Sequence, residues 1–165
     1  GAIEVGDGTR VGARFSVYLP AADIADAPRP PRAELARGRG RVLLVDDEAP
    51  LRRTLRRALE HLGYTIIEAA DGAAAGEAFR ANRAELAAVV LDHVMPVMSG
   101  GDAYRIMRVI DPSVPVILTS GWLEESVEHE LRALGIDKVM AKPFDIEELS
   151  QVLRAAVGDP PGARG

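Results

Sequence analysis

The sequence predicts an α/β protein: a doubly wound, five-stranded parallel sheet with helices on both faces. Between residues 41 and 157, runs of β-branched residues and leucine alternate five times with stretches whose apolar residues recur at helical spacing. The runs AAVVL at 87–91 and VPVIL at 114–118 lack polar alternation, as expected of central strands that are buried on both sides. A chain of 165 residues that is 47% hydrophobic can bury one such core.

The first strand and helix illustrate the pattern. Residues 41–45 form an apolar β-branched run, and residues 50–62 carry leucine at 51, 55, 59 and 62 with Gly63 just beyond, where a helix is expected to end. Thr65 and Glu68 interrupt the second strand, which places it at an edge of the sheet. The further units are expected at 65–69 and 73–82, 87–91 and 101–110, 114–118 and 124–134, and 138–141 and 146–157.

The first 40 residues follow a different pattern. Ile3 and Val5 alternate with other residues, and so do Phe15, Val17 and Leu19 beyond a glycine-rich stretch, which predicts a β-hairpin. Because two strands alone do not make a stable fold, the hairpin must pack on something else. Alanine, proline, arginine and glycine dominate the next stretch, which predicts a linker. We therefore expect a hairpin at 1–20, a linker at 21–40, an α/β domain at 41–158 and a tail at 159–165.

Composition limits the classes of function. A net charge of -5 argues against holding nucleic acid by bulk electrostatics, and the cluster Arg52, Arg53, Arg56 and Arg57 is interpreted as a solvated helix face. The seven residues after Gly158 are too few for a DNA-binding output domain. No cysteine is present, which excludes disulfides and thiolate metal sites. No apolar run is long enough to cross a membrane, so we expect a cytoplasmic segment without membrane contact.

Polar side chains stand where the predicted strands end. Asp46 and Asp47 follow the first strand, Asp92 the third, Thr119 the fourth and Lys142 the fifth. Ligands of open parallel sheets bind at the carboxyl ends of the strands, so these side chains are expected to gather at one rim. Their coincidence on four strands is more specific than any one short motif.

These residue types suit phosphoryl chemistry. Carboxylates from two adjacent strand ends form an oxygen pocket for Mg²⁺, although Asp46 and Asp47 alone could equally be a helix cap. Lys142 can neutralise an incoming phosphoryl group, and the hydroxyl of Thr119 can donate to it. The carboxylate of Asp92 can act as a nucleophile and form an acyl phosphate. Together the residues favour the metal interpretation over the cap.

Four segments resemble the receiver domain of bacterial response regulators: VLLVDDE at 42–48, VVLDHVMPVMSG at 89–100, VILTSG at 116–121 and KPF at 142–144. The resemblance implies a flavodoxin-like sheet of order 2-1-3-4-5 and a cis bond before Pro143. It implies that Asp92 is the phosphoacceptor, that Lys142 contacts the phosphoryl group and that Thr119 supplies the hydroxyl of a conformational switch. Mg²⁺, with Mn²⁺ as a substitute, would be held by Asp46, Asp47, Asp92 and the backbone carbonyl of Val94.

The hairpin has a resemblance of its own. GAIEV at 1–5 and GARFSVYLP at 12–20 are similar to the last two strands of the ATP-binding domain of sensor histidine kinases, with Ala13 where threonine is usual. This implies the C-terminal part of a hybrid histidine kinase, whose parent protein can be membrane-attached. The partner would be a phosphohistidine domain or a histidine phosphotransfer protein. An accidental or vector-derived origin of these residues stays open.

The functional hypothesis is therefore a Mg²⁺-dependent receiver in a phosphorelay, with conformational switching and slow dephosphorylation. At most it would catalyse its own phosphorylation and dephosphorylation, so whether to count it as an enzyme is left open. A metal-dependent phosphatase would want an acid or base two residues after its nucleophile, where Val94 stands. A pseudo-receiver that only binds proteins stays open. Val139 replaces the usual aromatic switch residue, so the signal is expected to use residues 119–130 instead.

Overall fold

The computed structural model describes residues 1–7, 13–19, 35, 37–121, 131, 133–136 and 138–158. The chain divides into two compact units, Gly1–Arg32 and Ala33–Gly165. Most of the predicted linker, most of the predicted helix at 124–134, and the predicted tail lie outside the described residues. In the described part, no helix combines the length and apolar character that crossing a membrane requires.

The N-terminal unit contains the predicted antiparallel strand pair. β1 (Ala2–Asp7) pairs with β2 (Ala13–Tyr18), with Ile3 opposite Val17 and Val5 opposite Phe15. Because opposed residues of an antiparallel pair project to the same side, these four apolar side chains share one face. All four are exposed.

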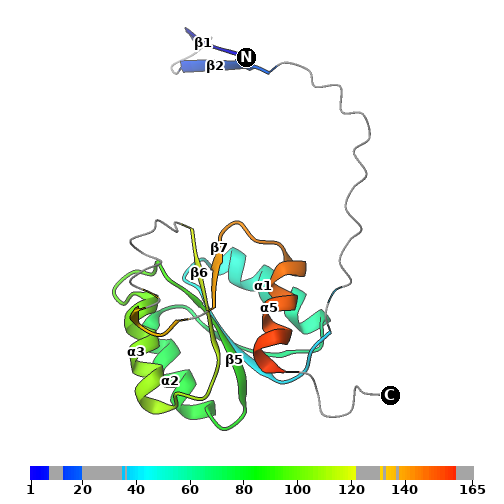
Figure 1. Cartoon of the computed structure of the whole chain (residues 1–165). Helices are drawn as coiled ribbons and strands as arrows, with labels where there is room; N and C mark the ends of the chain where they lie inside the picture. Colours follow the sequence, from blue (N-terminus) through cyan, green and yellow to red (C-terminus); the bar gives the residue numbers. More distant parts are fainter. Residues whose placement is uncertain are drawn as a thin grey trace. The chain divides into compact units, whose positions relative to one another are not determined.

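The second unit is built on a parallel sheet of five strands (Figure 1). The spatial order is β4-β3-β5-β6-β7, which is second, first, third, fourth and fifth along this unit. This order confirms the predicted 2-1-3-4-5 sheet and the predicted edge position of the second strand. The strands are β3 (Arg41–Val45), β4 (Thr65–Ala69), β5 (Leu86–Asp92), β6 (Val116–Ser120) and β7 (Val139–Ala141).

Helices cover both faces of the sheet, as predicted (Figure 1). α1 (Ala49–His61) and α5 (Ile146–Val157) pack on one face, and α2 (Gly72–Asn82) and α3 (Gly100–Ile110) on the other. The side chains of Asp71, Ser99 and Asp145 accept backbone N–H bonds at the starts of α2, α3 and α5. Such caps satisfy N–H groups that have no partner inside the helix.

The core is split by the sheet into two apolar clusters. Along β3, Val42 and Leu44 belong to the cluster under α1 and α5, whereas Leu43 and Val45 belong to the cluster under α2 and α3. This alternation follows from the two-residue period of a strand. A continuous apolar run therefore fills both sides of the sheet, which is why the sequence could predict helices on both faces.

Two strand ends differ from the prediction in a way that matters for the site. β6 begins at Val116 because Pro115 has no N–H to donate, and it runs on to Ser120. β5 extends through Asp92. Asp92 and Thr119 are therefore strand residues, and they are direct neighbours in the parallel register. The strands hold both residues rigidly, which the positions predicted just beyond the strands would not do.

Candidate functional site

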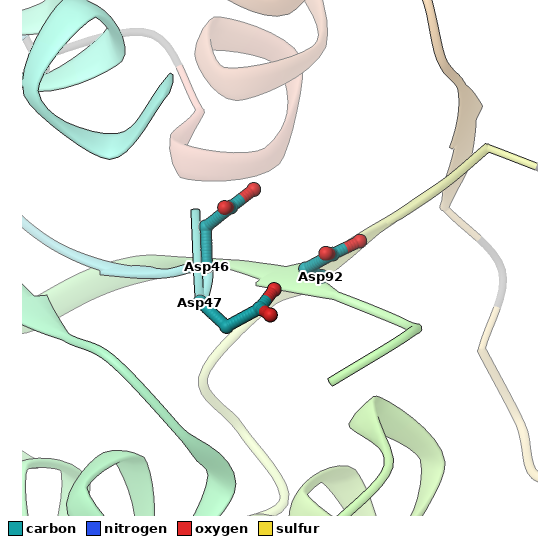
Figure 2. Close-up of side chains that lie close together, drawn as sticks. All are labelled: Asp46, Asp47 and Asp92. Atoms are coloured by element: carbon teal, nitrogen blue, oxygen red, sulfur yellow. The ribbon is translucent and has the colours of Figure 1, made fainter. Parts of the chain in front are cut away.

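Three carboxylates meet at the carboxyl edge of the sheet (Figure 2). Asp46 and Asp47 follow β3, and Asp92 is the last residue of the neighbouring strand β5. One carboxylate oxygen of each lies within 4.8 Å of the others. Asp46 and Asp92 are 2% and 6% exposed, whereas Asp47 is open to solvent. Two buried carboxylates so close together repel each other, so the arrangement requires a compensating cation.

Lys142 supplies part of that compensation. It follows β7, and its Nζ lies 3.0 Å from Asp46 Oδ2 and 3.1 Å from Asp92 Oδ1. Its backbone N–H donates to the carbonyl of Ser120 at 2.7 Å, which fixes the start of the loop after β7. The Lys142–Pro143 peptide bond is cis, as the resemblance implied. Lys142 thus bridges two carboxylates that come from different strands.

The pKa values of this group follow from burial and charge. Burial raises the pKa of Asp92, and the negative charge of Asp46 adds to the rise, while Lys142 opposes it. For Lys142, burial lowers the pKa, but its bonds to Asp46 and Asp92 outweigh burial and the net pKa is raised. The lysine therefore stays protonated at neutral pH. A charged ammonium between two carboxylates is the state that the geometry favours.

Asp46 is held by partners on every side. Its N–H donates to the carbonyl of Ala69 at 3.3 Å, its Oδ1 accepts from the N–H of Glu48 at 2.8 Å, and its backbone carbonyl accepts from Arg52 Nη1. Glu48 is the N-cap of α1 and makes no side-chain cap bond. Helix capping therefore does not account for the Asp46–Asp47 pair, because neither carboxylate accepts from the first turn of α1 among the printed contacts of that helix.

Thr119 lies beside the acidic group. It is 2% exposed and adjoins Asp92 across the β5–β6 pair. Its backbone carbonyl accepts from the N–H of His93 at 2.8 Å, which ties the end of β6 to the turn after β5. Val94 is exposed, and its backbone N–H is hydrogen-bonded to the carboxylate of Asp92. The sequence prediction thus brought together residues that the fold does place together.

The turn between β5 and α3 shapes the floor of the site. A Cβ on Gly100 would lie 2.3 Å from the backbone oxygen of Asp92, so only glycine permits this close approach. Val97 in the same turn has a positive φ of 70° and a fully exposed side chain. Beside Asp47, a groove of about 380 Å³ opens between this turn and the one before α2, lined chiefly by small and apolar residues, among them Ala70, Ala73, Pro96 and Met98.

Sequence reasoning missed one residue of this group, Arg52. It was interpreted as part of a solvated basic face, and that is correct for Arg53 and Arg57, which are exposed. Arg52 instead reaches back to the carbonyl of Asp46 and pairs with Glu68. The one available signal was its position in the first turn of a helix that follows two acidic residues. Of the three histidines, His61 is exposed, the Nδ1 of His93 is buried without a hydrogen-bond partner among the described residues, and His129 lies outside them, as does Trp122.

Comparison with known families decides the identity of the fold and its site. The model of the response regulator receiver domain matches residues 42–154, which is more than half of the chain. The chain belongs to this family. As a receiver domain, it is a component of two-component signalling, and receivers in general interact with histidine kinases or phosphotransfer proteins.

The receiver domain has relatives of two kinds. The sensor kinase CckA of Brucella abortus is 34% identical over 161 residues, which cover 92% of this chain and 17% of the relative. The probable transcriptional regulatory protein TcrX of Mycobacterium tuberculosis is 40% identical over 116 residues, covering 69% and 48%. The chain thus spans less than half the length of either protein. These relatives confirm the two-component setting.

A solved structure bears on the metal. The receiver domain of sensor histidine kinase PA1611 from Pseudomonas aeruginosa, with a magnesium ion coordinated in its active site cleft, has a TM-score of 0.67 and 27% identity, covering 74% of this chain and all of that one. Receiver domains bind Mg²⁺ in such an acidic site. The residues present here fit that ion, because three carboxylates against one ammonium leave two negative charges in excess and all the ligand atoms are hard oxygens.

Proposed function

We infer that this receiver domain accepts a phosphoryl group from a phosphohistidine onto Asp92 in a Mg²⁺-dependent reaction. The observation that carries this inference is the position of Lys142, whose ammonium lies 3.1 Å from Asp92 Oδ1 and 3.0 Å from Asp46 Oδ2. A nucleophilic carboxylate next to a cation and an oxygen-rich metal pocket is the arrangement that phosphoryl transfer requires.

The step balances as a displacement at phosphorus. A carboxylate oxygen of Asp92 attacks the phosphorus, an O–P bond forms, and the P–N bond to the donor histidine breaks. The departing imidazole nitrogen keeps the bonding electron pair and takes up a proton. The product is an acyl phosphate on Asp92, and later attack of water on its phosphorus returns the carboxylate and inorganic phosphate.

The chain's own residues position and neutralise the reacting groups. Asp46, Asp47, Asp92 and the backbone carbonyl of Val94 would hold the Mg²⁺, which when bound supplies positive charge to the phosphoryl oxygens. Mn²⁺ accepts the same oxygen ligands and is proposed as a substitute. Lys142 exchanges its contact with the Asp92 carboxylate for a phosphoryl oxygen. Thr119, buried beside Asp92, donates its hydroxyl to another phosphoryl oxygen.

The movement of Thr119 supplies the conformational signal. Drawing its hydroxyl toward a phosphoryl group shifts the end of β6 and, through it, the segment at 119–130, most of which lies outside the described residues. Val139, half-buried on β7 beside Leu118 of β6, has no ring that could swing inward. The readout is therefore assigned to the segment after β6 and not to an aromatic side chain.

The domain boundaries and the parent protein are also proposals. The CckA relative aligns over 161 residues, more than the receiver at 42–154 alone, which supports a hybrid histidine kinase as the parent. The exposed apolar face of Ile3, Val5, Phe15 and Val17 supports a hairpin at 1–20 that belongs to an ATP-binding domain. A linker at 21–40 would then lead to the receiver at 41–158, with a tail at 159–165. The donor would be a cytoplasmic phosphohistidine domain or a phosphotransfer protein.

Intact-mass measurement after incubation with acetyl phosphate tests the proposal. We expect the mass to rise by one phosphoryl group in the presence of Mg²⁺ and not in the presence of a chelator. Asp92→Asn should abolish the rise, whereas Glu77→Gln, at an exposed position on α2, should leave it intact. Labelling of Asp92→Asn at full stoichiometry would overturn the assignment of Asp92. A wild type that binds no Mg²⁺ and is not labelled would favour a pseudo-receiver.

A further inference from the structure

We propose that Arg52 is a positioning residue for the metal pocket, holding the backbone of Asp46 through a link to the edge strand; this inference rests on the proposed Mg²⁺-dependent function. Arg52 lies in the first turn of α1, directly after the acidic residues. Its Nη1 donates to the backbone carbonyl of Asp46. The contact therefore holds the peptide that carries both Asp46 and Asp47.

Glu68 on β4 anchors the guanidinium. Arg52 Nε lies 3.3 Å from Glu68 Oε1, an ion pair without the geometry of a hydrogen bond. The side chains are 15% and 25% exposed, so the pair is better shielded from water than an ordinary surface ion pair. Glu68 adjoins Leu44 across the β3–β4 pair, which gives the anchor a fixed place next to the strand that ends at Asp46.

The contact with Asp46 is compatible with metal binding. Lys142 binds the carboxylate of Asp46, so its bond must adjust when a metal and a phosphoryl group arrive. Arg52 binds the backbone carbonyl instead and leaves both carboxylate oxygens to their other partners. It can therefore hold the main chain throughout the reaction cycle. This is the role of groups that orient metal ligands from behind.

A purely electrostatic effect of Arg52 would have the opposite sign. A guanidinium near the pocket repels a divalent cation, so its removal would tighten Mg²⁺ binding. A positioning effect predicts weaker binding on removal, because the Asp46–Asp47 peptide gains freedom that the metal must then restrict. The direction of the change in affinity thus separates the two.

The chain offers a matched control one turn along the helix. Arg56 also pairs with Glu68, at 2.9 Å, and with Glu60, at 2.8 Å. No contact between Arg56 and Asp46 occurs among the hydrogen bonds and ion pairs of the described residues. Arg56→Ala therefore removes a charge and a Glu68 contact on the same helix without releasing Asp46.

The experiment is a calorimetric Mg²⁺ titration of the complete chain. Arg52→Ala should raise the Kd for Mg²⁺ by about tenfold, the low end for residues that orient metal ligands, while Arg56→Ala should stay within about twofold of wild type. Glu68→Gln, which keeps Arg52 and only loosens its anchor, should give an intermediate Kd and serves if Arg52→Ala does not fold. Arg52→Lys should restore binding in part, since it keeps the charge and one donor.

Labelling by acetyl phosphate gives a second readout. For Arg52→Ala, the rate should fall at low Mg²⁺ and recover toward wild type at saturating Mg²⁺, as expected of lost ion affinity with intact chemistry. Equal Kd values for Arg52→Ala and Arg56→Ala, or tighter binding by Arg52→Ala, would overturn the positioning role. A wild type that does not bind Mg²⁺ would instead overturn the proposed function, so the two failures are distinguishable.

Discussion

Lys142 and Asp46 are 96 positions apart in the sequence, yet the lysine Nζ lies 3.0 Å from Asp46 Oδ2. The parallel sheet brings them together, since β3 and β7 deliver their carboxyl ends to the same rim. Lys142 is also 3.1 Å from Asp92 Oδ1, so it is the internal counter-ion of two buried carboxylates. Its removal should therefore affect the stability of the fold as well as phosphoryl transfer.

Lys142→Met is expected to destabilise the metal-free protein by about 1–2 kcal/mol, because Asp46 and Asp92 would stay buried without their cation; the partial exposure of the lysine keeps the loss below that of a fully buried pair. Urea unfolding with a chelator present measures it. Mg²⁺ should recover more stability in this variant than in wild type. Lys138→Met, on the other side of β7, is the control, and an equal loss there would contradict the counter-ion role.

Asp92→Asn is expected to stabilise the metal-free fold at neutral pH. Burial raises the pKa of Asp92, so its protonation favours the folded state, and the carboxylate's cost appears as the pH rises through that raised pKa. The gain from Asp92→Asn should therefore be largest at pH 7 and should shrink toward pH 4, where the wild-type carboxyl is itself protonated. Unfolding free energies at both values test this. A gain that is independent of pH would argue against charge burial as the cause.

The sequence predicted the strand order and the gathering of Asp46, Asp47, Asp92, Thr119 and Lys142 because strand ends of a parallel sheet share a rim. It could not predict the contact of Arg52 with the carbonyl of Asp46. That contact depends on how α1 is rotated against β4, and the spacing of leucines fixes the buried face but not the reach of one long side chain.

The positive φ of Val97 also escaped prediction. Only the local backbone reveals it, because valine is among the residues least suited to this region of φ and ψ.

Val97→Asn should stabilise the domain by about 0.5–1 kcal/mol, because a left-handed backbone costs about 1–2 kcal/mol for a residue with a bulky Cβ and asparagine tolerates it better. The valine side chain is fully exposed, so little packing is lost. Val109→Asn is the matched control, since Val109 is also exposed but lies in the regular helix α3. Thermal unfolding of both variants gives the comparison. If the two substitutions change stability equally, backbone strain at Val97 is not the reason.

Gly100→Ala and Gly101→Ala place the same methyl group at adjacent positions with opposite expected results. At Gly100 the new Cβ would lie 2.3 Å from the backbone oxygen of Asp92, so α3 or the end of β5 must shift, and we expect a loss of about 1–3 kcal/mol. At Gly101 the nearest atom, Leu134 Cδ1, is 3.6 Å away, so the methyl fits and alanine should gain about 0.5–1 kcal/mol in the helix.

Urea unfolding measures both changes, and labelling by acetyl phosphate measures their effect on the site. Because the atom that Gly100→Ala displaces belongs to the residue that accepts the phosphoryl group in our proposal, labelling should slow in that variant and stay at the wild-type rate in Gly101→Ala. A Gly100→Ala variant that is destabilised but labelled normally would show that α3 gives way and Asp92 does not. The position of the phosphoacceptor would then be set by the β5–β6 pairing with Thr119 and not by the glycine turn.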